Sequence, residues 1–395
     1  LYKSVVLERA YLEQKAREHG DARGHFYGVT MQADAPEAHI GFVENRLLEG
    51  SDDISKTYER RYKKTPEHPI LAFVEAYRKV RVLSTGTARD ERVKVIDQAL
   101  TQLTQAVEGM PRSAEVHHLL GTLLHLKYLD QGKTQSAIDG QSHYLLALDL
   151  AWDNLRYRAP ILQQLGLLQA AVGNHFRAVD HYGARERMPF VGASAELNLH
   201  LMKARSLFHS GKAGEAVVSA NLALALTKRE GLGRYRPWIL DRLGLYHYVA
   251  GNFREAKRAY DLHGNLKDRT ENWEGDASWN SIRYHSMKGA SALGAGEAAE
   301  ALTEFETAME LVEELPPDSV APLGTLGLRG RSAKHGSSDH QIILLGLMAE
   351  AYVAKGSLNH AARLVLERRE LLRKRFKEFE RPQDLAEIAH CSYRL

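Results

Sequence analysis

The sequence predicts an all-α solenoid of stacked helical hairpins, and an internal repeat is the first observation that predicts it. Along the 395-residue chain, a glycine followed five residues later by an alanine recurs at intervals. The pairs are Gly132/Ala137, Gly173/Ala178, Gly211/Ala216, Gly251/Ala256, Gly296/Ala301 and Gly356/Ala361. The last five pairs also have a small residue twelve positions before the alanine. In those five, an aromatic, aliphatic or small residue follows four positions after the alanine. Self-similarity of this kind is typical of repeat architectures.

The second observation is that each unit has the pattern of two helices and a tight turn. In the clearest copy, Leu165 and Gly166 mark one face of a first helix, and Ala178 and Tyr182 mark one face of a second. Gly173 ends the first helix, because glycine adopts the left-handed conformation without a Cβ penalty. Small residues let the two helices cross closely, and the aromatic residue fills the space beyond. A lone hairpin cannot bury both faces, so the copies are expected to stack around one continuous core.

The repeat resembles the tetratricopeptide repeat, whose signature is a large apolar residue, Leu-Gly, an aromatic residue and a later small–aromatic–small set. The resemblance covers roughly residues 70–378 and implies a right-handed superhelix of about six or seven hairpins. Two further copies, anchored on Ala204 and Ala349, are degenerate because alanine replaces the glycine. The matching copies are Leu162…Leu165-Gly166…Ala178…Tyr182, Leu240…Leu243-Gly244…Ala256…Tyr260 and His285…Gly289…Ala301…Phe305…Ala308.

An earlier unit runs from His117 and Gly121 through Tyr144 and Ala147, and its turn is expected to carry extra residues at 128–134. Before the repeats, residues 1–65 are interpreted as an N-terminal helical capping region or as degenerate repeats. An amphipathic helix is expected at 1–18, ended by Gly20 and the stretch 21–28. Two more helices are expected at 39–48 and 53–64, and Pro69 opens the next one.

The solenoid is expected to span 66–378, followed by a C-terminal tail at 379–395. A long Gly-, Pro- and Ser-rich loop at 315–340 interrupts it. Loops of this length in compact arrays are either functional or disordered, and both interpretations stay open. Trp273, in a shorter irregular segment, is expected to pack across a repeat junction.

Composition excludes several classes of protein. A net charge of +3 is too small to suggest nucleic acid as a partner, and no apolar run reaches the length of a transmembrane helix. The single cysteine, Cys391, excludes an internal disulfide framework and a cysteine-based metal cluster. The chain begins at Leu1 without a methionine, so a fragment or a processed form is expected. We therefore expect a soluble chain, cytoplasmic or exported, of unknown compartment and oligomeric state.

The sequence contains no recognisable catalytic motif, and we predict neither an enzyme nor a cofactor. It has no phosphate-binding glycine loop, nucleophile elbow or His-Glu-x-x-His pair. His117, His118, His125 and His143 invite a metal hypothesis, but converging carboxylates are missing, so structural histidines are the better interpretation.

In the family that the repeat resembles, the first helices of successive hairpins line a concave groove that binds a peptide or helix of another protein. Transfer by position predicts a partner-binding groove, and Arg205, Arg242 and Arg283 are expected to form a basic strip in it. Because a shift of one residue turns a helix by about 100°, a core role stays open for each residue. The predicted residues are Asn198, Met202, Arg205, Phe208, His209, Trp238, Asp241, Arg242, Tyr248, Arg283 and Met287.

Aromatic, Met and Arg side chains are enriched in binding surfaces, so this composition favours a non-enzymatic protein-interaction scaffold that assembles a larger complex. The lysine and asparagine clamp of chaperone-tail binders is absent: Thr122, Leu167 and Arg205 occupy clamp asparagine positions. A ligand-responsive regulatory sensor, whose superhelix changes shape on binding, is the alternative.

Overall fold

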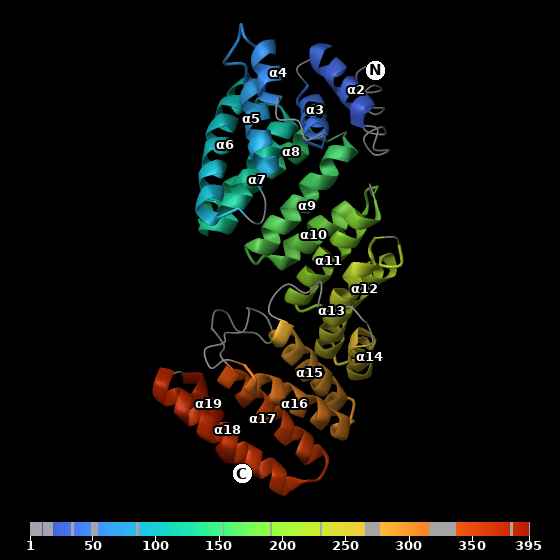
Figure 1. Cartoon of the computed structure of the whole chain (residues 1–395), viewed down its shortest axis with the longest axis vertical. Helices are drawn as coiled ribbons and strands as arrows, with labels where there is room; N and C mark the ends of the chain where they lie inside the picture. The colour runs from blue at the N-terminus through green and yellow to red at the C-terminus, as the bar shows by residue number, and fades with distance from the viewer. Residues whose placement is uncertain are drawn as a thin grey trace. The chain divides into compact units, whose positions relative to one another are not determined.

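The computed structural model describes residues 10, 19–32, 35–48, 54–83, 87–152, 154–189, 192–229, 231–264, 277–315, 337–379 and 382–394. Within these ranges every regular element is helical (Figure 1), which confirms the predicted all-α class. The chain divides into two compact units, Leu1–Pro189 (unit 1) and Phe190–Leu395 (unit 2). None of the described helices has both the length and the apolar character needed to cross a membrane.

Unit 1 is built from helices that pair with their neighbours in sequence: α2 with α3, α5 with α6, α7 with α8, and α9 with α10. Its largest apolar cluster joins Phe26, Phe73, Leu103 and Leu123, and therefore runs through successive pairs. The helices are α2 (His19–Gln32), α3 (Pro36–Leu48), α4 (Ile54–Arg61), α5 (Pro69–Val82), α6 (Arg89–Gly109), α7 (Ala114–Gln131), α8 (Thr134–Leu150), α9 (Leu155–Ala171) and α10 (His175–Glu186).

Unit 2 repeats the arrangement with the pairs α11/α12, α13/α14, α15/α16 and α17/α18, and α19 packs on α18. Each second helix also packs on the first helix of the next pair, as a solenoid requires. The elements are α11 (Ala193–His209), α12 (Ala213–Leu226), the 3-10 turn η1 (Gly233–Tyr235), α13 (Arg236–Val249), α14 (Phe253–Gly264), α15 (Ala277–Gly294), α16 (Ala298–Glu313), α17 (Ser337–Ala354), α18 (Leu358–Phe379) and α19 (Pro382–Arg394).

Five of the hairpin turns share one hydrogen-bonding pattern. In the α13/α14 turn, the Gly251 N–H donates to the Tyr248 carbonyl at 3.0 Å, and the Asn252 N–H donates to the His247 carbonyl at 2.9 Å. Gly251 has a φ of 79°, in the left-handed region that glycine adopts without strain. This is the Schellman arrangement, which satisfies the last carbonyls of a helix. The glycines at 173, 211, 296 and 356 repeat it, so the predicted helix ends are confirmed.

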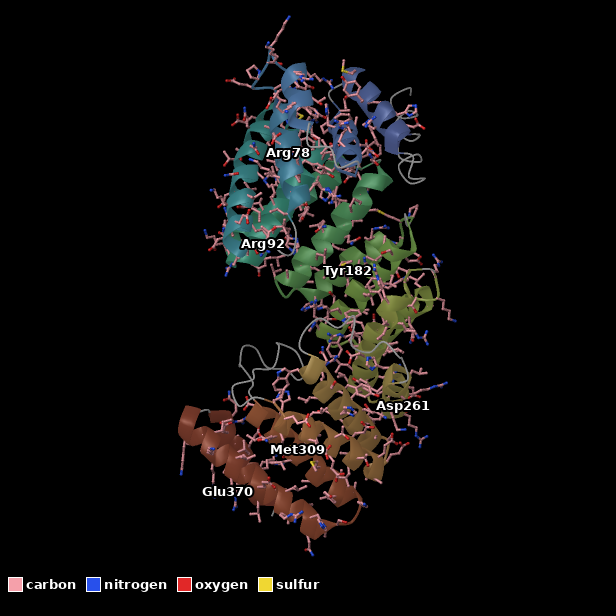
Figure 2. All side chains as sticks on the ribbon, in the orientation of Figure 1. Arg78, Arg92, Tyr182, Asp261, Met309 and Glu370 are labelled. Atoms are coloured by element: carbon pink, nitrogen blue, oxygen red, sulfur yellow. The ribbon has the colours of Figure 1, made fainter. Side chains whose placement is uncertain are left out.

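In four hairpins, a glycine of the first helix faces an aromatic residue of the second. A Cβ added at Gly244 would lie 2.5 Å from the Tyr260 ring, closer than real Cβ atoms approach. Tyr260 is fully buried, and its ring also lies 6.1 Å from that of Tyr284 on the next first helix. We call this space, between the two helices of a hairpin and the following helix, the aromatic site. The equivalent pairs are Gly121/Tyr144, Gly166/Tyr182 and Gly289/Phe305. Tyr182 is labelled in Figure 2.

The prediction that the turn at 128–134 holds the extra residues of the α7/α8 hairpin is wrong. α7 continues to Gln131, and only Gly132 and Lys133 separate it from α8. In the α7/α8 hairpin, the turn glycine, Gly132, comes eleven residues after the packing glycine, Gly121. In the α9/α10 hairpin, the corresponding glycines, Gly173 and Gly166, are only seven residues apart. The additional residues amount to about one helical turn in each helix. A whole turn leaves the buried face unchanged, so Tyr144 still packs on Gly121.

The prediction that residues 21–28 interrupt the helical structure is also wrong, because α2 runs through them to Gln32. A glycine in a helix interior costs about 1 kcal/mol relative to alanine. Burial offsets this cost: Ala22 and Phe26 are fully buried, and the Phe26 ring packs directly on Gly41 of α3.

The expected helices at 39–48 and 53–64 correspond to α3 and α4, and Pro69 opens α5 as predicted. The expected C-terminal tail, 379–395, contains α19. Most of the predicted helix at 1–18, Trp273 and the interior of the 315–340 loop lie outside the described residues. The predicted domain boundaries stay predictions.

Candidate functional site

The predicted groove residues lie on three first helices of unit 2, and together we call them the first-helix face. On α11, Asn198, Arg205 and His209 are exposed, and Met202 and Phe208 are half-buried. On α13, Trp238, Arg242 and Tyr248 are half-buried, whereas Asp241 is buried. On α15, Arg283 and Met287 are both buried.

A buried tyrosine that the sequence did not single out brings α11 and α13 together. The ring of Tyr246 lies 4.9 Å from that of Phe208. Burial raises the pKa of Tyr246 to about 12, although the positive charges of Arg242 and Arg205 partly oppose the rise. Both guanidinium groups therefore act on the same ring from two different helices. The signal in the sequence was an aromatic residue one helical turn after Arg242.

Arg242 is held against an aromatic face. Its Cζ atom lies 5.5 Å from the centroid of the Trp238 ring, within the range of a cation–π interaction. The Arg242 side chain keeps about a third of its surface exposed, at 34%. Trp238 therefore orients a guanidinium group that still faces solvent, and such a group can pair with a carboxylate of a partner.

Asp241 and Arg283 form a buried ion pair between α13 and α15. Their closest N···O distance is 2.6 Å, and the two side chains are only 1% and 7% exposed. Burial opposes the charge on Arg283, but Asp241 outweighs it and raises the arginine pKa. Arg283 therefore adds no exposed charge to the predicted basic strip, which reduces to Arg205 and Arg242. Met287, 6% exposed, also lies in the packed interior.

Tyr248 lies at the other end of α13, where the face meets a later helix. Its ring packs against Phe253 at 5.5 Å, across its own hairpin turn. Burial raises the Tyr248 pKa, and the negative charge of Glu350 on α17 raises it further. A carboxylate therefore lies near the face at this end, whereas the guanidinium groups of Arg205 and Arg242 lie at the other.

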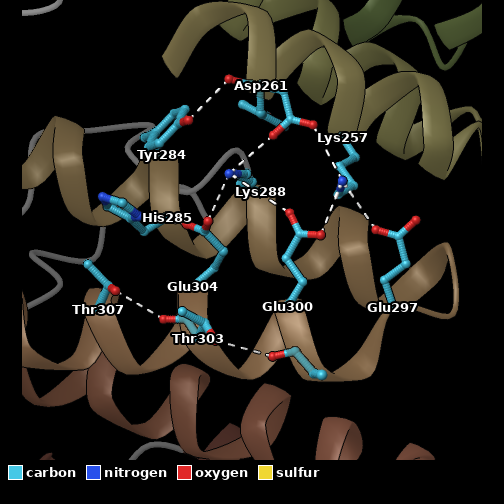
Figure 3. A network of polar contacts seen from close by, with 12 residues as sticks. Lys257, Asp261, Tyr284, His285, Lys288, Glu297, Glu300, Thr303, Glu304 and Thr307 are labelled. Atoms are coloured by element: carbon cyan, nitrogen blue, oxygen red, sulfur yellow. Dashed lines mark hydrogen bonds and ion pairs between the residues drawn. The ribbon is translucent and has the colours of Figure 1, made fainter. Parts of the chain in front are cut away.

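A network of ion pairs, which the sequence did not predict, crosses α14, α15 and α16 (Figure 3). Lys257 contacts Glu297 at 3.2 Å and Glu300 at 3.1 Å, and Lys288 contacts Asp261 at 3.1 Å and Glu304 at 2.8 Å. The carboxylates raise the pKa of both lysines despite their partial burial. Each lysine is surrounded by carboxylates of other helices, so the network cross-links the hairpins.

His285 also belongs to the network and contacts Glu304 at 2.7 Å (Figure 3). Burial opposes ionisation of Glu304, but the hydrogen bonds and charges of His285 and Lys288 outweigh it and lower the pKa.

The four histidines behind the metal hypothesis lie on α7 and α8. His117 and His143 stack on each other, with their Nδ1 atoms 3.1 Å apart. Burial lowers the pKa of His118 and of His125 to about 4, so both rings are neutral near pH 7. In the part of the chain that the structure describes, no group of three or more His, Cys, Asp or Glu side chains is placed to hold a metal ion.

The similarities of this chain to known proteins lie among solved structures. No family model matches the chain, and no curated protein matches it. Among solved structures, the thermophilic TPR protein TTC0263 of Thermus thermophilus is 18% identical, with 52% of this chain and 99% of that chain covered and a TM-score of 0.38. BtubC from P. vanneervenii is 15% identical, with 62% and 100% covered and a TM-score of 0.45.

A third structure is the signal transduction ATPase PH0952 from Pyrococcus horikoshii, which has a tetratricopeptide repeat sensor. It is 10% identical, with 91% of this chain and 49% of that chain covered and a TM-score of 0.47. Such low identities and TM-scores add nothing on function. The resemblance to tetratricopeptide repeats stands on the hairpins themselves, with their glycine turns and their glycine-to-aromatic contacts.

Proposed function

We propose that the chain is a non-enzymatic protein-interaction scaffold whose first-helix face binds an acidic peptide or helix of a partner in the assembly of a larger complex. The observation that supports this most is the convergence of Arg205 and Arg242, from α11 and α13, around the rings of Phe208, Trp238 and Tyr246. Stacked repeats present extended surfaces of this kind to their partners.

The chemistry of the face fits an acidic partner. Arginine binds carboxylates through two parallel hydrogen bonds, and aromatic rings beside it supply apolar area at a small entropy cost. Asp241 pairs closely with Arg283, at an N···O distance of 2.6 Å, but lies 3.9 Å from Arg242. Arg242 can therefore still pair with a carboxylate of a partner. The face is built on helices and needs little ordering, but the peptide loses freedom on binding. Affinities of order micromolar are therefore expected.

The test is an affinity capture from native extract, identified by mass spectrometry, with wild type and Arg205→Glu/Trp238→Ala side by side. A matched control, Arg254→Glu/Leu222→Ala, changes an exposed arginine on α14 and an exposed apolar residue on α12. We expect the first variant alone to lose a partner with an acidic segment, and the binding to weaken as salt is raised.

Circular dichroism must show that both variants keep the helicity of the wild type. If every captured partner is retained by Arg205→Glu/Trp238→Ala, the first-helix face is not the binding surface. Capture of two ligand classes that compete through a change of shape would favour the regulatory sensor instead.

A further inference from the structure

The hairpin α17/α18 has no aromatic residue in its aromatic site, unlike the hairpins α7/α8, α9/α10, α13/α14 and α15/α16. Ala349 takes the position of Gly244, and Val365 takes the position of Tyr260. The turn is otherwise the same: the Gly356 N–H donates to the Val353 carbonyl at 2.9 Å, with a φ of 78°. The aromatic site of this hairpin is therefore built by the same backbone but has no ring of its own.

A cavity of about 270 Å³ lies at this position, between α17, α18 and α19. A dry, apolar cavity of about 150 Å³ is enough to bind benzene. Small and aliphatic side chains form most of its wall, including Gly346, Ala349, Ala361 and Val365. Cys391 of α19 closes the third side, as Tyr284 of α15 does for the filled site of α13/α14.

Two of the polar groups that line the cavity, Glu350 and Arg368, suit a phenol better than an anion. In α7/α8, the Tyr144 hydroxyl donates to Thr122 Oγ1 at 3.3 Å, and Thr122 directly follows the glycine that packs on the ring. Glu350 directly follows Ala349 and lines the cavity, so a carboxylate stands where Thr122 stands in α7/α8. Arg368 is already engaged, with Glu387 at 2.7 Å and with the Ile342 carbonyl at 3.1 Å.

We propose that this cavity is a binding site for a tyrosine side chain of a partner polypeptide, which completes the α17/α18 hairpin as Tyr260 completes α13/α14. Two strongly exposed aliphatic residues also line the cavity, Val353 at 48% and Leu358 at 65%. They give the residues on either side of the tyrosine an apolar surface that a free phenol would not use. This favours a polypeptide as the source of the ring. The site lies on a different hairpin from the first-helix face, although the charge of Glu350 also acts on Tyr248 at the end of that face.

The experiment titrates the whole chain with four probes, followed by NMR or calorimetry. Two are small molecules, p-cresol and toluene. Two are alanine- and lysine-based helical peptides with leucine four residues to either side of a central Tyr or Phe. We expect p-cresol to bind at roughly millimolar concentration and the tyrosine peptide to bind at least tenfold more tightly. Toluene and the phenylalanine peptide should each bind several-fold more weakly than their hydroxylated counterparts, and Glu350→Gln should narrow that difference.

A variant that supplies the missing ring provides the second arm. Ala349→Gly/Val365→Tyr reproduces the Gly/Tyr pair of α13/α14 and should abolish binding of p-cresol and of the tyrosine peptide. Ala362→Phe places a ring at the exposed side of the cavity and should also abolish binding. It replaces the double variant in the test if the double variant misfolds. Arg363→Ala, exposed on α18 and outside the cavity wall, is the control and should bind as wild type does.

Absence of p-cresol binding, or binding that survives both Ala349→Gly/Val365→Tyr and Ala362→Phe, overturns the site. Binding of p-cresol without any gain from the tyrosine peptide overturns the polypeptide and points to a small phenol. A phosphotyrosine peptide that binds more tightly than the tyrosine peptide would contradict the role of Glu350, which repels an anion.

Discussion

The hairpins α13/α14 and α17/α18 belong to the same unit and share the same turn, yet they fill the space between their helices differently. In α13/α14, Tyr260 is fully buried against Gly244. In α17/α18, Ala349 and Val365 stand in those places and leave a cavity of about 270 Å³. The comparison teaches that turn and packing are set separately. The glycine at the turn fixes the hairpin, whereas in these two hairpins one pair of residues decides whether the space between the helices is filled by a ring or left as a cavity.

The largest effect is expected from Tyr260→Ala, which would empty the filled site. Large-to-small changes of buried aromatic residues cost about 3–5 kcal/mol, from lost burial plus the cavity left behind. Val365→Ala, at the partly exposed equivalent position, should cost only about 1 kcal/mol. Urea unfolding followed by circular dichroism compares the two. Equal losses would mean that the two sites do not differ in packing.

Gly244→Ala should come next. The added methyl group would meet the Tyr260 ring at 2.5 Å, and overpacking of this kind costs about 1–3 kcal/mol. The opposite change, Ala349→Gly, meets no ring and should cost about 1 kcal/mol from helix propensity alone. Thermal unfolding measures both. If Gly244→Ala stabilises the protein, as helix propensity alone would predict, the close contact of ring and glycine is not important.

The smallest effect concerns pH in α7/α8, where the filled site has a histidine beside it. The rings of His118 and Tyr144 lie 5.9 Å apart, and burial lowers the His118 pKa from 6.5 to about 4. The folded state therefore keeps His118 neutral while the unfolded chain binds a proton. The contribution of neutral His118 to the free energy of unfolding is therefore complete above pH 6.5 and is lost as the pH falls from 6.5 towards 4.

Between pH 7 and pH 6 we expect His118 to account for a loss of about 0.7 kcal/mol in the free energy of unfolding. Hydrogen exchange of α7 and α8, measured at both pH values in wild type and His118→Gln, checks this. The variant should show a smaller pH dependence, and an unchanged one would remove His118 as its source.

Prediction from the sequence was most accurate for features that depend on residues close together in the chain. The glycine turns and the glycine-to-aromatic pairs follow from backbone sterics and spacing, and both are present in the structure. It failed at α2, because the burial of Phe26 against α3 outweighs the helix-breaking tendency of nearby glycines. It also failed at α7/α8, where extra residues lengthen the helices and leave the turn short.

The candidate site was less predictable, since a helical position alone does not say how deeply a side chain is buried. Arg205 and Arg242 reach the surface, whereas Arg283 is drawn inwards by Asp241 of the neighbouring helix. The ion-pair network around Lys257 and Lys288 depends on three helices at once and left no signal in the sequence. The assignment of the first-helix face to partner binding stays a prediction.

The most direct test of the central claim is a crystal structure of the Ala349→Gly/Val365→Tyr variant. The claim is that the cavity of α17/α18 is an aromatic site that lacks its ring. We predict that the introduced ring lies between α17 and α18, packed on position 349, with the cavity filled and the helices in place. A ring that points to solvent, with the cavity of about 270 Å³ still open, would contradict it.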